Sequence, residues 1–363
     1  MKKILALLLF GGLLFSSCDP FHAKIEKDSE TDTALYYSSE KISTPASIPD
    51  TLTIATWNIK FGGGRIDFFF DCYGDRVLMT KDEVLSNLQG IAQEIKHINP
   101  DIIFLQEVDI SSKRSAYVDE LQWILDHTDL NYGYYGSQWK ADYVPSDGIG
   151  KMDSGSAILS KYPLSNARRI PLPLIEEQSG IVQYFYLRRN MLRATATIGA
   201  QSLEVITTHT SAYSTDGTRL KQLKEIKKEI DGVAAKGKKF VLGGDFNTLP
   251  PNTVVFEKFD DGACDDDPDF ATHSAKDELD YMNLFLDTYE PAISQADYDA
   301  DNSPYFSFTS DKNGFWNRKL DYLFTNGDFL DHSGLVHQNS ERGGAETMPL
   351  SDHAPVSVRL ILK

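Results

Sequence analysis

Short apolar runs alternate with amphipathic stretches from residue 51 to the C-terminal end of the chain. Residues 51–59 alternate polar and apolar side chains, which is typical of a half-buried strand. Residues 101–108 form an apolar run that ends in Gln-Glu, and this predicts a buried strand with polar residues at its tip. Further strands are predicted at residues 155–160, 191–198, 202–209, 239–243, 320–325 and 354–362.

Amphipathic segments between these runs predict helices. Thr80 and Glu83 form a capping box, and the helix that follows runs to about His97, where Asn99-Pro100 stops it. Strands mixed with helices throughout predict an α/β protein of two or four layers, without a break that would divide it into two domains. Two more helices are predicted, near residues 115–128 and 216–234.

The N-terminal residues have the pattern of an export signal. Two lysines precede an apolar run over residues 4–15, which is too short to span a bilayer, and Ser-Ser-Cys follows it. The position of Cys18 resembles a bacterial lipoprotein signal, although Phe15 stands where such signals usually carry Leu. We therefore expect a lipid on Cys18; an ordinary cleaved signal, with an incidental cysteine, is the alternative.

These features predict the organisation of the whole chain. We expect a signal peptide over residues 1–17, a flexible polar tether over 18–50 and one catalytic domain over 51–363. The protein is then exported and lipid-anchored to a bacterial membrane, on the periplasmic side or the cell surface, and we expect it to be a monomer. A formal net charge of -17 argues against tight, non-specific DNA binding through phosphate neutralisation.

Polar side chains lie at the ends of most predicted strands. Because strand ends of one sheet pair meet at one rim, these groups are expected to form a site on a rigid scaffold. Carboxylate and amide oxygens suit Mg²⁺ or Mn²⁺, and there is no compact zinc motif, P-loop or GxSxG sequence. Metal, His and Asp together indicate attack of water on a phosphoryl centre. The residues concerned are Asn58, Glu107, His209, Asp245, Asn247, Asp321, Asp352 and His353.

Six short motifs in this order resemble the deoxyribonuclease I-like endonuclease/exonuclease/phosphatase superfamily, over about residues 51–363. The resemblance implies a four-layer α/β (α+β) sandwich in which two mixed β-sheets pack face to face with helices on the outer faces. The motifs are Thr56-Trp57-Asn58, Gln106-Glu107-Val108, Thr208-His209-Thr210, Gly244-Asp245-Phe246-Asn247, Leu320-Asp321-Tyr322 and Ser351-Asp352-His353.

The resemblance also implies a ligand set for the metal. Glu107 is expected to be the principal ligand of Mg²⁺ or Mn²⁺, with Asn58 beside it. Asp352 is expected to support this site or a second metal position. The cation acts as a Lewis acid on a non-bridging phosphate oxygen.

The remaining motif residues are expected to act on water and on the phosphoryl group. Asp321 orients His353, and the resemblance leaves open whether His353 or Asp245 takes the proton from water. Asn247 and His209 are expected to donate hydrogen bonds to the phosphoryl oxygens as negative charge develops.

The expected reaction is divalent-metal-dependent hydrolysis of a phosphate ester by in-line attack of an activated water. A lipid headgroup or sugar phosphate is ranked slightly above nucleic acid, because the chain has few Lys/Arg-rich clusters and carries a predicted membrane anchor. A nuclease is the first alternative. A non-catalytic surface binding protein of the same fold is the second, although such a relative should have lost Glu107, Asn247 or His353.

Arginines ahead of and within the strand that leads to His209 have two open interpretations. Any one of Arg188, Arg189 and Arg193 could clamp a phosphate, and a surface role is equally compatible with each.

Overall fold

The computed structural model covers most of the chain. The predicted signal peptide and the expected lipidation site at Cys18 lie outside the described residues. Within the described part, no helix combines the length and the apolar character needed to cross a membrane. The structure describes residue 25 and residues 31–43, 45, 47–71, 74–212, 216–253, 278–309, 316–339 and 346–362.

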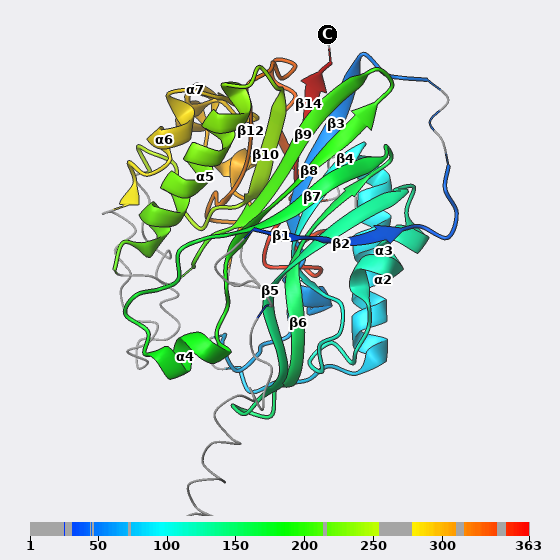
Figure 1. The fold of residues 1–363 in the computed structure, drawn as a ribbon, viewed down its shortest axis with the longest axis vertical. Helices are drawn as coiled ribbons and strands as arrows, with labels where there is room; N and C mark the ends of the chain where they lie inside the picture. The colour runs from blue at the N-terminus through cyan, green and yellow to red at the C-terminus, as the bar shows by residue number, and fades with distance from the viewer. Residues whose placement is uncertain are drawn as a thin grey trace, which may run out of the picture.

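Two seven-stranded sheets form the centre of the molecule (Figure 1). In spatial order, the first sheet contains β1 (Asp32–Thr33), β7 (Leu164–Pro171), β8 (Asn190–Ile198), β9 (Gln201–His209), β10 (Phe240–Asp245), β12 (Asp321–Thr325) and β11 (Glu290–Pro291). The second contains β13 (Leu335–Val336), β14 (Val356–Ile361), β3 (Thr51–Asn58), β4 (Ile102–Asp109), β6 (Gly150–Ser160), β5 (Tyr132–Val144) and β2 (Leu35–Ser38).

Helices cover the outer faces of both sheets. Figure 1 shows α5 and α6 on one side of the strands and α2 and α3 on the other. The remaining short elements are α4, α7 and the 3-10 turns η1 and η4. The bounds are η1 (Lys60–Gly62), α2 (Lys81–Ile98), α3 (Glu120–His127), α4 (Gly180–Phe185), α5 (Thr218–Ala234), α6 (Asn283–Leu286), α7 (Gln295–Ala300) and η4 (Ser303–Tyr305).

Neighbouring residues of one strand face different cores. Phe104 of β4 packs between the two sheets, whereas Leu105 packs toward α2 and α3. In the first sheet, Val241 faces the second sheet and Leu242 faces α5. The central strands therefore bury both faces, which explains the continuous apolar runs in the sequence. The arrangement confirms the predicted four-layer sandwich with two mixed sheets.

Some elements differ from those predicted. The capping box at Thr80 is present, but the helix predicted from residue 115 begins only after Asp119, whose side chain accepts a hydrogen bond from Gln122 N. Strands β5 and β7 were not predicted. Glycines, tyrosines and charged residues interrupt the period of two in β5, and β7 carries adjacent arginines, so neither shows a clean alternation.

Residues 32–38 differ from the expected tether because they join both sheets. Strand β1 pairs with β7 in the first sheet, and β2 pairs with β5 in the second, so the chain crosses between the two sheet edges at Ala34. Ala34 is buried in the core between the sheets, and Tyr37 packs against the core beneath α2 and α3. Sheet edges offer unpaired backbone groups, and this segment satisfies them on both sides.

The two sheets approach closely at Gly243 in β10. A Cβ atom at this position would lie 2.4 Å from Leu323 Cδ2 and 2.7 Å from Phe104 Cδ2, an atom of the opposite sheet. Only hydrogen fits there without displacement of the neighbours. Because Asp245 lies two residues farther along β10, this contact helps to set the depth of Asp245 against the second sheet.

Gly243→Ala is expected to destabilise the protein by about 1–3 kcal/mol through overpacking. The matched control is Gly232→Ala in α5, where a Cβ atom would meet nothing within 4 Å. The control is expected to be neutral or to gain up to about 1 kcal/mol from helix propensity. Urea unfolding of the three proteins measures both effects. Equal stability of the two variants would contradict a tight contact between the sheets at Gly243.

Candidate active site

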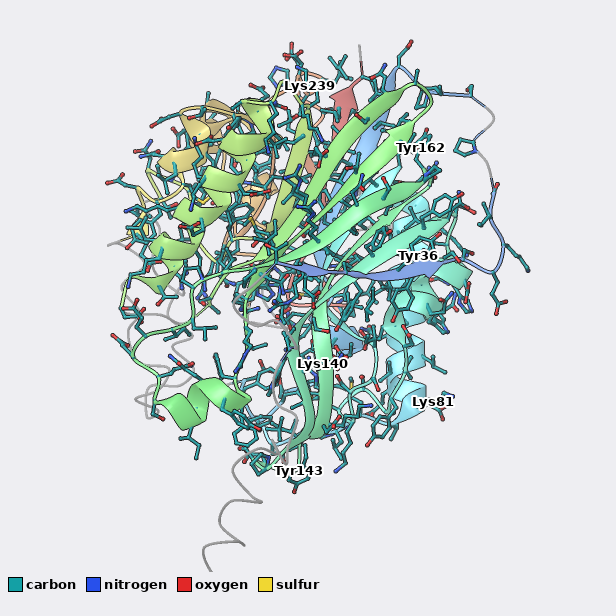
Figure 2. The ribbon with its side chains drawn as sticks, viewed as in Figure 1. Tyr36, Lys81, Lys140, Tyr143, Tyr162 and Lys239 are labelled. Atoms are coloured by element: carbon teal, nitrogen blue, oxygen red, sulfur yellow. The ribbon has the colours of Figure 1, made fainter. Side chains whose placement is uncertain are left out.

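The predicted site residues come together at one end of the two sheets. His209 and Asp245 end the parallel strands β9 and β10, and they pair directly in the sheet register. Asp321 begins β12 and pairs with Asp245 across the antiparallel register. Asn58 ends β3, which is parallel to β4 and its residue Glu107. The site lies at the end of β10 away from Lys239, which immediately precedes that strand. Figure 2 shows Lys239 at the opposite end of the molecule from Lys140 and Tyr143 of the β5–β6 hairpin.

The Asp245 carboxylate is the centre of this cluster. Its Oδ2 atom lies 3.2 Å from Asn58 Nδ2, 3.2 Å from His209 Nε2 and 3.6 Å from His353 Nε2. Its Oδ1 atom accepts a hydrogen bond of 2.9 Å from Asn247 N. Asp245 is only 1% exposed, and burial raises its pKa to about 7 although His353 acts in the opposite direction.

His353 is held between two carboxylates. Its Nδ1 atom lies 2.8 Å from Asp321 Oδ2, and Ser307 Oγ donates to the same oxygen at 2.7 Å. Burial lowers the pKa of His353, but Asp321 and Asp245 outweigh this effect and raise it to about 10. The charged ring can therefore donate from Nδ1 to Asp321 and present its Nε2 hydrogen toward Asp245.

Backbone strain turns Glu107 toward the site. Glu107 has a φ of 56°, and the pairing of β4 with β6 shifts register between Leu105 and Val108. A non-glycine residue in this region costs about 1–3 kcal/mol, so the surrounding sheet must hold it there. Gln106, the preceding residue, bonds to Thr207 Oγ1 of the other sheet at 3.0 Å. The Glu107 side chain is 31% exposed and is thus more accessible than the other carboxylates of the cluster.

The contacts of Asn58 bear on its expected role as a metal ligand. Its Nδ2 group donates to Glu107 Oε1 at 3.1 Å and to Asp245 Oδ2 at 3.2 Å. Its Oδ1 atom accepts from Lys60 N at 3.0 Å, which leaves one lone pair for a cation. The amide nitrogen of Asn58 therefore faces Glu107, and its oxygen faces Lys60 N. Glu107 offers an accessible oxygen ligand that fits Mg²⁺ or Mn²⁺, and Asn58 could add an oxygen only through its remaining lone pair.

Asp352 already has a protein cation beside it. Lys60 Nζ lies 3.6 Å from Asp352 Oδ2 and 2.9 Å from Asp71 Oδ2. Burial would raise the pKa of Asp352, but Lys60 and then His353 lower it below its usual value. Sequence reasoning missed Lys60, and its place two residues after Asn58 was the only available signal. The contact leaves Asp352 less available to a metal than Glu107.

The hydrogen-bond donors of His209 and Asn247 depend on ring protonation and on backbone conformation, respectively. The pKa of His209 is lowered well below its usual value, first by burial and then by Arg189 and His353. The ring is therefore neutral; its Nε2 faces Asp245, and its buried Nδ1 has no hydrogen-bond partner among the described residues. Asn247 adopts a left-handed φ of 46° and donates from Nδ2 to Thr210 O at 3.0 Å. One further Nδ2 hydrogen remains for a ligand.

Three buried side chains also satisfy the geometry of a cation site. Asp245, Asp321 and His353 each offer one ligand atom, and these atoms lie within 4.8 Å of one another. Both nitrogens of His353 already face carboxylates, so a cation would have to displace a proton from the ring. This arrangement fits proton transfer better than it fits metal binding.

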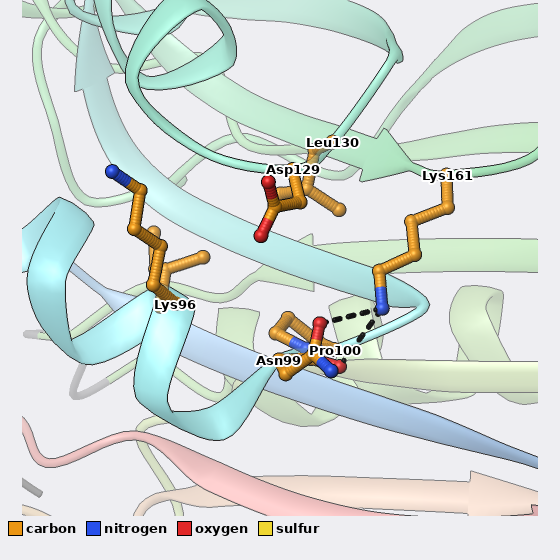
Figure 3. Close-up of a pocket in the computed structure, with 7 residues that line it drawn as sticks. Lys96, Asn99, Pro100, Asp129, Leu130 and Lys161 are labelled. Atoms are coloured by element: carbon orange, nitrogen blue, oxygen red, sulfur yellow. Dashed lines mark hydrogen bonds between the residues drawn. The ribbon is translucent and has the colours of Figure 1, made fainter. Parts of the chain in front are cut away.

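The small hollow drawn in Figure 3 lies away from these residues. It is lined by Asn99 and Pro100, which precede β4, whereas Glu107 lies near the other end of that strand. Lys161 fills part of it and donates to Asn99 Oδ1 at 2.7 Å. The hollow therefore contributes nothing to the cluster around Asp245.

Comparison with known proteins identifies a family that matches most of the chain. The sequence profile of the Endonuclease/Exonuclease/phosphatase family matches residues 55–353. This span begins before Asn58 and ends at His353, so it contains every member of the cluster. No curated protein sequence matches this chain.

Solved structures share the fold at low sequence identity. An endonuclease/exonuclease/phosphatase from Beutenbergia cavernae is 18% identical over 86% of this chain and 72% of its own, with a TM-score of 0.57. A family member from Bacteroides thetaiotaomicron is 16% identical over 85% and 94% of the two chains, with a TM-score of 0.51. A mannosyl-6-phosphatase from the same organism is 16% identical over 86% and 100%, with a TM-score of 0.50.

Mg²⁺ or Mn²⁺ is expected to raise the melting temperature of the protein, and Glu107→Gln is expected to abolish the rise. A ligand at 100 times its Kd stabilises the folded state by about 2.7 kcal/mol, which a thermal shift measures readily. Glu290→Gln, at an exposed carboxylate of β11, is the matched control and should retain the shift. An unchanged shift in Glu107→Gln would locate the cation elsewhere, for example at the Asp245–Asp321–His353 group.

Proposed function

Because the chain belongs to the endonuclease/exonuclease/phosphatase family, we propose that it hydrolyses a phosphate ester through metal-dependent, in-line attack of water. Family members are typically metal-dependent phosphoesterases. The observation that carries the proposal is the contact of the buried Asp245 carboxylate with His353, which Asp321 orients, beside the accessible carboxylate of Glu107.

In this proposal Glu107 is the principal metal ligand, and the free lone pair of Asn58 Oδ1 is the second protein contact. The bound divalent cation supplies Lewis-acid polarisation of a phosphoryl oxygen. Asn58 also restrains Glu107 and Asp245 through its amide nitrogen, so the ligand and the proton acceptor keep a constant separation. Asp352 supports this region while paired with Lys60.

The attacking water donates a hydrogen bond to the Asp245–His353 pair, which takes up its proton. The water oxygen forms a bond to phosphorus while the ester P–O bond opposite it breaks, and the alcohol leaves with a proton from solvent. Asp321 fixes the ring of His353 through Nδ1, and Ser307 fixes Asp321 in turn. Asn247 donates its remaining amide hydrogen to a phosphoryl oxygen. A neutral His209 has a single ring hydrogen, so its donation to the phosphoryl group requires that the Nε2 hydrogen be shared with Asp245. Donors already held by backbone and carboxylate contacts need little reorganisation when charge develops on the phosphoryl group.

A small or lipid phosphoester is the substrate class that we favour over nucleic acid. A net charge of -17 disfavours a protein that follows a polyanionic backbone. The mannosyl-6-phosphatase that shares this fold acts, by its name, on a sugar phosphate, which supports a small substrate without identifying one. Nucleic acid stays the competing substrate for the same chemistry.

Turnover is expected in the presence of Mg²⁺ or Mn²⁺ on at least one of four substrate types: nicked plasmid, sphingomyelin, inositol phosphates and nitrophenyl phosphoesters. Asn247→Ala is expected to lower kcat by about 10²–10³-fold through loss of one oxyanion donor. His353→Ala is expected to lower it by about 10²–10⁴-fold through loss of proton transfer.

Surface residues of the same type serve as controls for these variants. Asn166→Ala changes an exposed asparagine that shares the left-handed conformation of Asn247, and His97→Ala changes an exposed histidine of α2. Both controls should retain activity. If no substrate turns over faster with the wild-type protein than with Asn247→Ala and His353→Ala, the non-catalytic binding protein becomes the better explanation.

We also propose that the protein is exported and attached to a bacterial membrane by a lipid on Cys18. The support is the basic start, the short apolar run and the Ser-Ser-Cys sequence. A lipid anchor would hold the active site near membrane-bound substrates, which agrees with the preference for a small or lipid phosphoester.

Cys18→Ser is expected to release the protein from the membrane fraction of a bacterial host and to abolish incorporation of labelled palmitate. Cys72→Ser is the matched control and should remain labelled. Labelling that survives Cys18→Ser, or a wild-type protein that is never labelled, would contradict the anchor.

A further inference from the structure

Arg189 lies at the edge of the active site. It immediately precedes β8, and the carbonyl of its neighbour Asn190 accepts a hydrogen bond of 3.3 Å from Thr208 Oγ1. Strands β8 and β9 are antiparallel, so the start of β8 and His209 at the end of β9 lie at the same end of the sheet. Arg189 is therefore brought to the cluster around Asp245 by the same sheet that carries His209.

The guanidinium of Arg189 is buried, and few polar groups of the protein compensate for its lost hydration. Arg189 is 9% exposed, and its Nη1 atom donates to Gln138 Oε1 at 3.1 Å. Gln138 is itself fixed by a hydrogen bond of 2.9 Å from its Nε2 atom to Ser156 Oγ. No carboxylate in the part of the chain that the structure describes forms an ion pair with Arg189. A guanidinium has five N–H donors, so most of them are left for a ligand.

Two other buried arginines, Arg114 and Arg219, have carboxylate partners. Arg114 binds Asp109 through two hydrogen bonds of 2.8 and 2.9 Å, and Arg219 pairs with Glu278. Arg193, four residues after Arg189, is half-buried and lies 2.7 Å from Glu204. Of the three arginines that the sequence left open, Arg188 instead donates to main-chain carbonyls, at 2.6 Å for that of Gln183.

The electrostatic surroundings of Arg189 favour an anion from outside. Burial lowers the pKa of Arg189, while the fields of Glu107 and Asp245 oppose that change from beyond ion-pair distance. A buried charge without a partner is costly, and a guanidinium matches phosphate oxygens in a bidentate geometry. A cation bound at Glu107 would neutralise the negative charge of that carboxylate. The positive charge of Arg189 would then be less compensated, which favours the binding of an anion.

We propose that Arg189 binds a terminal oxygen of the substrate phosphoryl group and thereby selects phosphate monoesters over diesters. This inference rests on the phosphate-ester hydrolysis proposed above. A monoester has three non-bridging oxygens and up to two negative charges, whereas a diester has two such oxygens and one charge. Glu107 would hold a cation that polarises one oxygen, Asn247 and His209 would donate to the second, and Arg189 would donate to the third. In a diester, an esterified oxygen with an organic group would face the guanidinium instead.

The test compares p-nitrophenyl phosphate with bis-p-nitrophenyl phosphate in the wild-type protein, Arg189→Met and Arg189→Lys. The wild-type protein is expected to prefer the monoester. Arg189→Met is expected to lower kcat/KM for the monoester by about 10²–10³-fold, as loss of a buried charged donor does. For the diester the expected change is below about 5-fold, because no interaction with Arg189 is lost. Arg189→Lys should recover part of the monoester activity, since it keeps the charge without the fork.

A binding measurement separates this inference from the enzymatic proposal. Calorimetric titration with inorganic phosphate, in the presence of Mg²⁺, should give a Kd at least about tenfold higher in Arg189→Met than in the wild-type protein. Arg193→Gln, a neighbouring arginine with carboxylate partners, is the control for both kinetics and binding and should behave as wild type. Thermal unfolding checks that each variant is folded.

Each outcome supports or overturns the assignment. Equal losses for monoester and diester in Arg189→Met would show that Arg189 only positions neighbouring groups, and a wild-type preference for the diester would also overturn the selectivity. Unchanged phosphate binding in Arg189→Met would overturn the inference even if no ester is hydrolysed. Absence of turnover in the wild-type protein, with phosphate binding that depends on Arg189, would instead count against the proposed hydrolysis and in favour of the anion site.

Discussion

The site depends on the solvation of one buried carboxylate. Asp245 has lost nearly all contact with water, so polar groups of the protein must replace it. They come from both sheets: His209 lies beside Asp245 in the first, while Asn58 and His353 belong to segments of the second. Neither sheet could satisfy this carboxylate alone. The site therefore forms only when the two sheets pack face to face.

Around this centre, charge is arranged in opposite pairs with two exceptions. Asp321 is matched by His353, and Asp352 is matched by Lys60. Among the described residues, the accessible carboxylate of Glu107 accepts from the amide of Asn58 and lies 3.9 Å from His209 Nε2, and the guanidinium of Arg189 donates to the amide of Gln138 without a carboxylate partner. An accessible carboxylate suits a metal ion, and a guanidinium without a carboxylate partner suits a phosphoryl anion.

Local strain is concentrated at the same residues. Glu107 and Asn247 both adopt left-handed backbone conformations; Glu107 lies at the register shift within β4, and Asn247 follows β10. Such conformations persist only where surrounding structure over-determines them. The bulge in β4 and the pairing of β9 with β10 provide that restraint. Strands β4 and β10 each bury their two faces in separate cores, which fixes their positions. The strain directs one carboxylate and one amide out of the sheet toward a ligand.

The sequence by itself determined the strands with continuous apolar runs, the capped helix after Thr80 and the polar residues at the strand ends, because periodicity and capping are local properties. Its motifs also indicated the four-layer fold. Strand β5, whose pattern is irregular, and the crossing of residues 32–38 between the two sheets appeared only in the structure, since each is stabilised by partners distant in sequence. The carboxylate partners of Lys60, and the lack of a carboxylate partner for Arg189 among the described residues, were likewise decided by tertiary structure. Charge compensation depends on distances of a few ångströms between segments that the linear order of residues does not specify.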